Sequence, residues 1–256
     1  MNVTPKKRLG QHFLADQNIL GVIERLAELG PGDVALEIGP GLGMLTRFLA
    51  DRVAHLHAVE LDRSLEPHLA ELAARPNVDL HWGDALALDL AALEPAPTKL
   101  VANLPYNVAT PIVAESLAGL PSIELWCVMV QREVADRFFA EPSTKAYGAV
   151  SVVVQLAARR TGFHPVARTV FRPPPNVDSA LVAFSRTELP PGFDRVKRVV
   201  EGSFGHRRKT LPNSLVLAGL ASREQAVAAL AAIGRAPATR AEELSPPEFV
   251  ALAEAL

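Results

Sequence analysis

Val34-Ala-Leu-Glu-Ile38, followed by Gly39-Pro-Gly-Leu-Gly43, is the stretch that decides the fold. The first five residues are mostly apolar and predict a short buried strand, and the glycine-rich turn leads into a helix expected from Met44 to about Asp51. Such a turn lets a ligand approach the backbone closely. The stretch therefore predicts an open, mostly parallel α/β sheet with a ligand site where the strands end.

The spacing of these glycines and the acid before them narrow the class of ligand. A dinucleotide-binding turn reads G-x-G-x-x-G, whereas here Met44 stands where the third glycine would be. Glu37 would repel a pyrophosphate but favours a cationic ligand, such as the sulfonium of S-adenosylmethionine (SAM). A nicotinamide dehydrogenase is therefore disfavoured.

The next three predicted strands, over residues 56–60, 78–82 and 99–102, also end in polar groups. Glu60 suits the two hydroxyls of a ribose, with Asp62 as a competing acid, and Asp84 can accept a hydrogen bond from an adenine amino group. Because the carboxyl ends of parallel strands meet at one edge of a sheet, we expect a nucleoside cofactor at that edge.

Asn103-Leu104-Pro105-Tyr106 ends the fourth predicted strand and points to the substrate. The Asn103 amide oxygen and the Leu104 carbonyl are two acceptors, and Pro105 stiffens the turn that presents them. The Tyr106 ring offers a face for stacking. This set suits a planar base that carries an amino group, although a plain proline turn after a strand remains the alternative.

The rest of the chain predicts the end of the sheet and a helical domain. Strands over 125–130, 149–156 and 179–184 complete a seven-stranded sheet, and 170–176 is rigid and extended because of its prolines. No strand follows residue 187; residues 193–203, 215–217, 223–232 and 246–255 predict helices. We therefore expect a catalytic domain over 1–187, with an N-terminal arm over 1–15, and a small helical RNA-binding domain over 188–256.

The distribution of charge favours a nucleic-acid partner although the net charge is −2. Residues 1–12 carry +3, and residues 158–210 carry eleven basic and four acidic side chains, so the remainder carries −12. The cluster Phe204-Gly-His-Arg-Arg-Lys-Thr210 is the most basic in the chain. We expect it to contact phosphates, the alternative being a solvated helix end.

Other features exclude several classes of protein. No apolar run approaches the ~20 residues of a membrane span, and no secretory signal follows the basic N-terminus. Cys127 is the sole cysteine, so there is no internal disulfide. His55, His57 and His81 show no metal-ligand spacing along the chain, and we expect no metal site. A cytoplasmic location is the natural inference.

Several motifs, taken in order, resemble those of the bacterial ribosomal small-subunit RNA adenine dimethyltransferases, and the resemblance covers nearly the whole chain. They are Lys7-Arg-Leu-Gly-Gln-His-Phe-Leu14, Glu37-Ile-Gly-Pro-Gly-Leu-Gly43, Ala58-Val-Glu-Leu-Asp62, Gly83-Asp84-Ala85-Leu86, Asn103-Leu-Pro-Tyr-Asn107, Val130-Gln-Arg-Glu-Val134, Phe171-Arg-Pro-Pro-Pro-Asn-Val-Asp-Ser179 and Arg207-Arg-Lys-Thr-Leu211.

The resemblance implies a Rossmann-like class I SAM-dependent methyltransferase. Such an enzyme places two methyl groups on each of two adjacent adenosines near the 3′ end of 16S rRNA, in a precursor of the small ribosomal subunit. The resemblance also implies cofactor contacts at His12, Leu14, Gly39, Glu60, Asp84 and Asn103, to which the strand-end pattern adds Glu37, Gly41 and Gly43. The expected catalytic residues are Asn103, Leu104, Tyr106 and Phe171, with Tyr106 and Phe171 on either side of the base. The expected RNA contacts are Lys6, Lys7, Arg8, Arg172, Arg207, Arg208 and Lys209. We expect a monomer.

Two positions depart from the family pattern: His12 stands where asparagine is frequent, and Pro212 stands where arginine is frequent. A ring nitrogen of His12 can still bond a cofactor, whereas Pro212 removes one phosphate contact. A DNA adenine methyltransferase and a non-catalytic RNA-binding assembly factor remain the alternatives.

Overall fold

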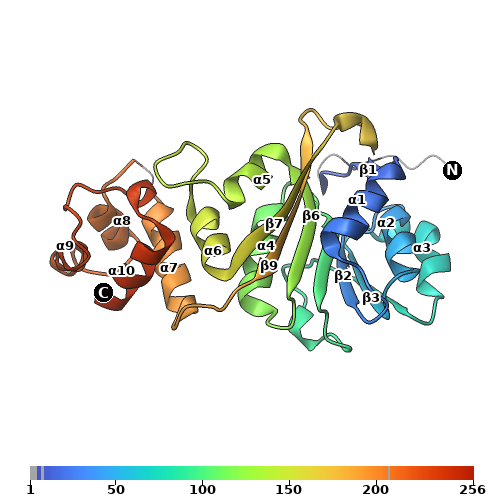
Figure 1. Cartoon of the computed structure of the whole chain (residues 1–256), viewed down its shortest axis with the longest axis horizontal. Helices are drawn as coiled ribbons and strands as arrows, with labels where there is room; N and C mark the ends of the chain where they lie inside the picture. The colour runs from blue at the N-terminus through green and yellow to red at the C-terminus, as the bar shows by residue number, and fades with distance from the viewer. Residues whose placement is uncertain (1–4, 7–8, 207) are drawn as a thin grey trace. The chain divides into compact units, whose positions relative to one another are not determined.

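The computed structural model describes residues 5–6, 9–206 and 208–256, and Figure 1 shows their path. The strands are β1 (Phe13–Leu14), β2 (Val34–Ile38), β3 (His55–Glu60), β4 (Val78–Trp82), β5 (Lys99–Asn103), β6 (Leu125–Gln131), β7 (Ala158–Val166), β8 (Phe171–Arg172) and β9 (Ser179–Arg186). The α-helices are α1 (Asn18–Ala27), α2 (Met44–Ala50), α3 (Glu66–Ala73), α4 (Ala109–Gly119), α5 (Arg132–Phe138), α6 (Ala149–Ala157), α7 (Phe193–Phe204), α8 (Leu211–Leu217), α9 (Arg223–Ala232) and α10 (Pro246–Ala255).

The main sheet has seven strands in the order β4-β3-β2-β5-β6-β9-β7, which confirms the predicted fold class. The pairs β4–β3, β3–β2, β2–β5 and β5–β6 are parallel, and β9 is antiparallel to β6. The order runs outward from β2 on one side and from β5 on the other. The connection after β2 therefore runs toward one edge of the sheet and the connection after β5 toward the other. Sheets of this kind bind ligands where the strand order reverses in this way.

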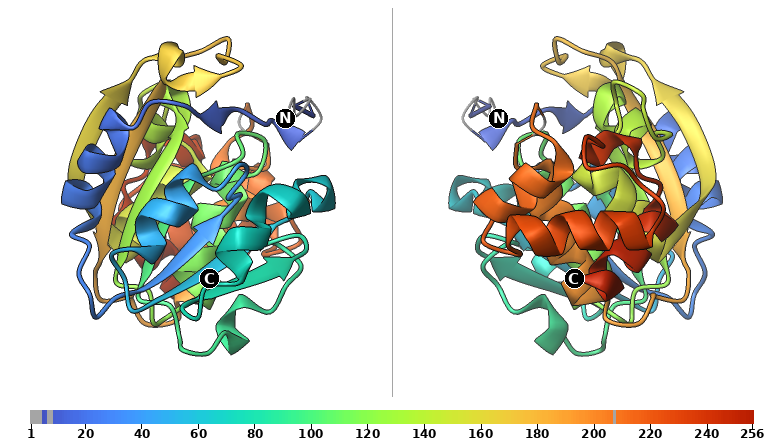
Figure 2. Two further views of the ribbon diagram at one scale, coloured as in Figure 1. Left: turned by 90° about the vertical axis from the view of Figure 1, so that its right-hand side faces the viewer. Right: turned by 90° about the vertical axis from the view of Figure 1, so that its left-hand side faces the viewer.

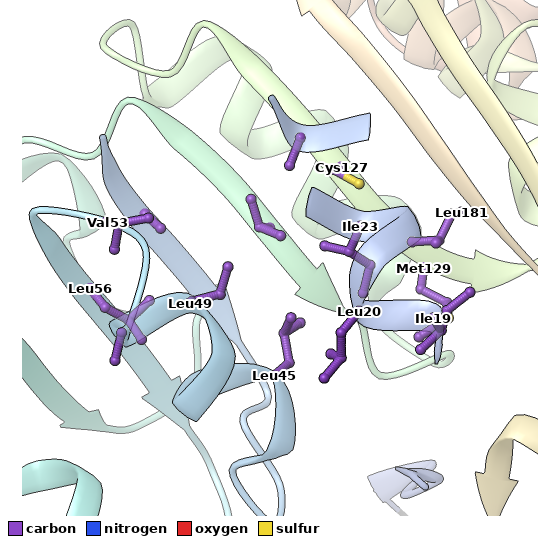
Figure 3. Packing of buried hydrophobic residues seen from close by; sticks show 14 of the residues in the cluster. Ile19, Leu20, Ile23, Leu45, Leu49, Val53, Leu56, Cys127, Met129 and Leu181 are labelled. Atoms are coloured by element: carbon purple, nitrogen blue, oxygen red, sulfur yellow. The ribbon is translucent and has the colours of Figure 1, made fainter. Parts of the chain in front are cut away.

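One face of the sheet is covered by α1 and α2. Figure 3 shows Ile19, Leu20 and Ile23 of α1 packed beside Cys127 and Met129 of β6. The α1 side chains face the sheet because they repeat at helical spacing along one side of the helix. The other face of the sheet packs against α4: the Trp126 indole donates to Ser116 of α4 at 2.9 Å and stacks on Phe184 of β9. The sheet is thus buried on both faces, as its apolar strands require.

A second, two-stranded sheet joins two distant segments. β1 of the N-terminal arm pairs antiparallel with β8, with Phe13 opposite Arg172 and Leu14 opposite Phe171. The His12 ring nitrogen Nδ1 lies 2.9 Å from the Pro173 carbonyl oxygen and extends this contact. The sequence predicts an N-terminal arm over 1–15 and an extended segment over 170–176, but it does not predict that the two segments pair.

The strand predicted at 149–156 is wrong, because these residues form helix α6. The run Ala149-Val-Ser-Val-Val-Val-Gln-Leu-Ala157 is rich in β-branched residues, and a short apolar run does not distinguish a strand from a buried helix. Gly148 precedes the helix, and its N–H donates to the Ser151 hydroxyl at 3.1 Å. The seventh strand of the sheet is instead β7, which follows immediately.

The chain divides into two compact units, residues 1–135 with 160–186 and residues 136–159 with 187–256. The predicted boundary near 187 coincides with the last crossing between the units, whereas 136–159 group with the C-terminal helices. In that second unit the Tyr147 hydroxyl donates to the Leu244 carbonyl at 2.8 Å, and Phe249 is fully buried. Figure 2 shows its C-terminal helices in orange and red. Among the described residues, no helix is long and apolar enough to cross a membrane.

Candidate active site

A cavity lies at the carboxyl edge of the first unit's sheet, where β2 and β5 are neighbours. Its walls come from the N-terminal arm, from the turns after β2, β3 and β4, and from the loop after β5. Of the residues predicted to bind cofactor or to act in catalysis, it brings together His12, Leu14, Glu37, Gly39, Gly41, Glu60, Asp84, Asn103, Leu104 and Tyr106. Segments distant in the sequence therefore converge where the strand-end pattern predicts.

The glycine turn after β2 has a backbone conformation and close neighbours that side chains would not fit. Gly39 and Gly41 have φ of +79° and +59°, in the left-handed region that favours glycine. A Cβ on Gly41 would lie 3.0 Å from the Phe13 ring, and one on Gly39 would lie 3.3 Å from the Pro105 ring. The turn is thus packed between the arm and the loop after β5. Gly43 precedes α2 and does not line the cavity.

Glu60 ends β3 with its carboxylate fixed by the backbone. Oε2 accepts from the Gly41 N–H at 3.1 Å, and Oε1 accepts from the Asp62 N–H at 2.8 Å. Burial raises the pKa of Glu60, and these two hydrogen bonds lower it in part. Each carboxylate oxygen keeps a second lone pair, so Glu60 can accept from two neighbouring hydroxyls, as the sequence predicts for a ribose.

Glu37 lies deeper, at the end of β2, and is only 1% exposed. Burial raises the pKa of its carboxyl to about 8. Its Oε2 has no hydrogen-bond partner within the described part of the chain. A buried carboxyl with one unpartnered oxygen favours a positive charge beside it, since ionisation there is otherwise costly. This arrangement agrees with the cationic ligand expected from the sequence.

Asn103 presents a buried acceptor. Its Nδ2 donates to the His12 carbonyl oxygen at 3.1 Å, and because a carbonyl can only accept, this bond fixes which end of the amide is which. Oδ1 is buried without a hydrogen-bond partner among the residues described. An orphaned amide oxygen at a cavity wall requires a donor from a ligand to satisfy it.

Hydrogen bonds anchor the loop after Asn103 at Leu104 and at Tyr106. The Leu104 N–H donates to the Met129 carbonyl at 3.0 Å. The Tyr106 hydroxyl hydrogen-bonds to the Ser179 hydroxyl at the start of β9. The Tyr106 ring lies against the His12 ring, with centroids 5.4 Å apart and planes tilted by 31°. Tyr106 is therefore a fixed aromatic wall of the cavity.

Asp84, at the turn after β4, is exposed and accepts from the Leu86 N–H at 2.9 Å.

Asp62, the predicted competitor of Glu60, binds the N-terminal arm. Its carboxylate accepts from Lys6 at 2.5 Å and from Gln11 at 2.8 Å. Although burial opposes it, these donors together with Ser64 hold the pKa of Asp62 well below its usual range. Asp62 thus ties the N-terminal arm to β3.

The predicted RNA contacts are placed unequally. Lys6 is engaged by Asp62, whereas Arg172 is exposed beside β1. In the second unit Arg208 and Lys209 are exposed just before α8. Lys7, Arg8 and Arg207 lie outside the described residues. Pro212, the departure from the family pattern, lies in the first turn of α8, where a missing N–H leaves no helix hydrogen bond unmade.

The structure does not place Phe171 opposite Tyr106. The Phe171 side chain is 1% exposed and belongs to the hydrophobic cluster formed with α1, and it does not line the cavity. The predicted stacking of both rings on one base is therefore not seen in this arrangement. The sequence did not predict that Ser179 supports Tyr106. The signal that could have indicated this is its position at the end of the same proline-rich motif as Phe171.

Together these residues offer the groups that a nucleoside cofactor with a cationic group needs. Glu60 provides paired acceptors, the glycine turn lines the cavity with backbone at Gly39 and Gly41, and Glu37 provides a buried acid. The residues thus fit the predicted class of cofactor.

Comparisons with known proteins agree with this reading. Residues 2–256 match the family model described as ribosomal RNA adenine dimethylase. A protein of Rubrobacter xylanophilus named ribosomal RNA small subunit methyltransferase A is 49% identical, over 97% of this chain and 94% of its own. A protein of the same name from Lactiplantibacillus plantarum is 45% identical, over 98% and 90%.

Two solved structures share the fold. A dimethyladenosine transferase from Plasmodium falciparum superposes with a TM-score of 0.78 at 23% identity, covering 94% of this chain and 96% of that one. The 23S rRNA methyltransferase ErmE superposes with a TM-score of 0.65 at 29% identity, covering 95% and 99%.

Proposed function

The chain belongs to the ribosomal RNA adenine dimethylase family, and from this membership we propose that it dimethylates the N6 amino groups of two adjacent adenosines near the 3′ end of 16S rRNA, using SAM. The single observation that carries the proposal is Oδ1 of Asn103, which is buried without a hydrogen-bond partner among the described residues and lies in the same cavity as the glycine turn. An adenine amino group is the donor that this acceptor lacks.

SAM supplies an electrophilic methyl group on a positively charged sulfur. Glu60 would hold the ribose hydroxyls, Asp84 the adenine amino group of the cofactor, and Glu37 would face the positive charge. The His12 ring nitrogen Nδ1 contacts the Pro173 carbonyl oxygen, and the His12 carbonyl oxygen accepts from Asn103 Nδ2. His12 therefore orients the catalytic amide.

The chain activates a poor nucleophile by positioning it. The lone pair of adenine N6 is delocalised into the ring. Hydrogen bonds from the amino group to Asn103 Oδ1 and to the Leu104 carbonyl localise that pair on nitrogen and aim it at the methyl group. The alkylated nitrogen is strongly acidic, so no dedicated base is required. The Tyr106 ring would stack on the extruded base, a contact worth roughly 1–3 kcal/mol.

The remaining part of the proposal concerns RNA binding by the helical unit and by exposed basic residues. We assign RNA binding to Arg208 and Lys209, to Arg207, which precedes them in the sequence, and to Arg172. The location would be cytoplasmic, where ribosomes assemble, and the active form a monomer.

Transfer of tritiated methyl groups tests the function directly. Small-subunit particles from cells that lack this protein should accept label at adenosines near the 3′ end of 16S rRNA, and duplex DNA should not. Label in DNA alone would favour a DNA adenine methyltransferase. Absence of any SAM turnover, with RNA binding intact, would favour an assembly factor without catalysis.

A further inference from the structure

Four side chains on β3 and β4 meet away from the cavity, on the face of the sheet opposite α1. They are His55 and His57 of β3 and Asp79 and His81 of β4. The parallel register sets His57 opposite Asp79, and alternate residues of a strand share a face. The expectation of no metal site rested on spacing along the chain. The register brings together residues that this spacing separates.

The distances between the facing atoms suit a bound ion. His55 Nε2 lies 2.9 Å from Asp79 Oδ2, His57 Nδ1 lies 3.9 Å from the same oxygen, and His57 Nδ1 lies 3.2 Å from His81 Nε2. The ligand atoms of His55, His57 and Asp79 all lie within 4.8 Å of one another. A tetrahedral ion with bonds of about 2.0–2.1 Å holds its ligand atoms about 3.3 Å apart, between the short and long distances here.

His57 is oriented as a ligand. Its Nε2 lies 2.8 Å from the Pro95 carbonyl oxygen, which can only accept, so Nε2 carries the hydrogen. Nδ1 therefore turns a lone pair toward Asp79 and His81. A backbone carbonyl behind the second ring nitrogen is the usual support of a metal-binding imidazole.

We propose that His55, His57 and Asp79 bind a divalent transition-metal ion of the Zn²⁺ class, with a water molecule as the fourth ligand. Imidazole nitrogens and one carboxylate oxygen are ligands that Zn²⁺ accepts in tetrahedral sites. The ion would join the edge strand β4 to β3 and, through the Pro95 carbonyl, hold the segment that follows β4. The ion would lie away from the cavity, which Glu60 lines at the other end of β3. The role of the ion would therefore be structural. The site does not depend on the proposed methyl transfer.

The test uses full-length, untagged protein stripped of metal and titrated with Zn²⁺ by calorimetry. One ion should bind per chain, and Co²⁺ in its place should give the intense visible absorption of a four-coordinate site. Asp79→Asn and His55→Gln should each weaken Zn²⁺ binding at least about tenfold. Their side chains are 51% and 17% exposed, so both variants should fold, which circular dichroism checks.

The matched control is His164→Gln, an exposed imidazole on β7 outside the cluster, which should leave the Zn²⁺ affinity unchanged. Zn²⁺ at about one hundred times its Kd should raise the Tm of the wild type by roughly 5–10 °C and that of Asp79→Asn by much less. Failure of the wild type to bind saturably, or equal affinity in all three variants, would show that the cluster is a hydrogen-bonded network without a metal.

Discussion

The hydroxyls of Tyr106 and Ser179 share a hydrogen bond that joins the loop after β5 to the first residue of β9. Ser179 is 1% exposed, so its hydroxyl has a fixed place in the fold. Burial raises the pKa of Tyr106, which keeps its hydroxyl neutral. The bond therefore fixes the position of the hydroxyl end of the ring on which a base would stack.

Changes at Tyr106 should separate the ring from its hydroxyl. Tyr106→Ala should lower kcat/KM by roughly 5- to 150-fold, the equivalent of a stacking energy of about 1–3 kcal/mol. Tyr106→Phe keeps the ring and should cost less than about tenfold, as should Ser179→Ala. Steady-state methyl transfer to small-subunit particles measures all three. Equal losses for Tyr106→Phe and Tyr106→Ala would count against stacking.

Phe171→Leu distinguishes a core residue from a stacking residue. Because Phe171 is buried in the cluster with α1, the change should lower the free energy of unfolding by about 1–3 kcal/mol with kcat nearly unchanged at low temperature. Thermal unfolding and single-turnover rates check this. A large loss of rate at unchanged stability would instead mean that Phe171 reaches the base, as the family resemblance implies.

The raised pKa of Glu37 should make the free energy of unfolding decrease as the pH rises. The folded carboxyl, with a pKa of about 8, holds its proton where the unfolded one, near 4.5, has released it. The free energy of unfolding should therefore fall as the pH rises from about 4.5 to about 8, by a few kcal/mol. Glu37→Gln should flatten this decline, and the exposed control Glu71→Gln should not.

The same carboxyl should couple SAM binding to protons. A cationic ligand favours the ionised acid, so binding near pH 7 should release close to one proton in the wild type and none in Glu37→Gln. Calorimetry in buffers with different ionisation enthalpies measures the number. Identical proton release in both proteins would place the positive charge elsewhere.

Salt dependence should separate basic residues that bind RNA from those that hold the fold. Alanine at Arg207, Arg208 and Lys209 should weaken RNA binding and reduce the steepness of its salt dependence by about 0.7–0.9 for each phosphate that the variant no longer neutralises. Lys6→Ala is the comparison, because Lys6 is paired with Asp62 and should leave the slope unchanged. An unchanged slope in the triple variant would exclude that cluster from the RNA interface.

The parts that could be predicted from the sequence are those set by local pattern. The strands that carry Glu37, Glu60 and Asn103 at or next to their last residue follow from apolar runs bounded by polar residues. Parallel pairing then forces their ends to one edge. The parts that could not be predicted depend on tertiary context. Helix α6 forms from a strand-like sequence because its valines are buried and the helix packs against α7 and α10. The pairing of β1 with β8, and of His57 with Asp79, depends on a strand register that local pattern does not specify.

Asn103 carries the central claim, and one pair of measurements on Asn103→Ala tests it most directly. The variant keeps the glycine turn, Glu37 and Glu60, so its Kd for SAM should rise only modestly, whereas methyl transfer to small-subunit particles should fall below detection. Asn103→Ala that binds SAM and still transfers methyl groups at the wild-type rate would contradict the account.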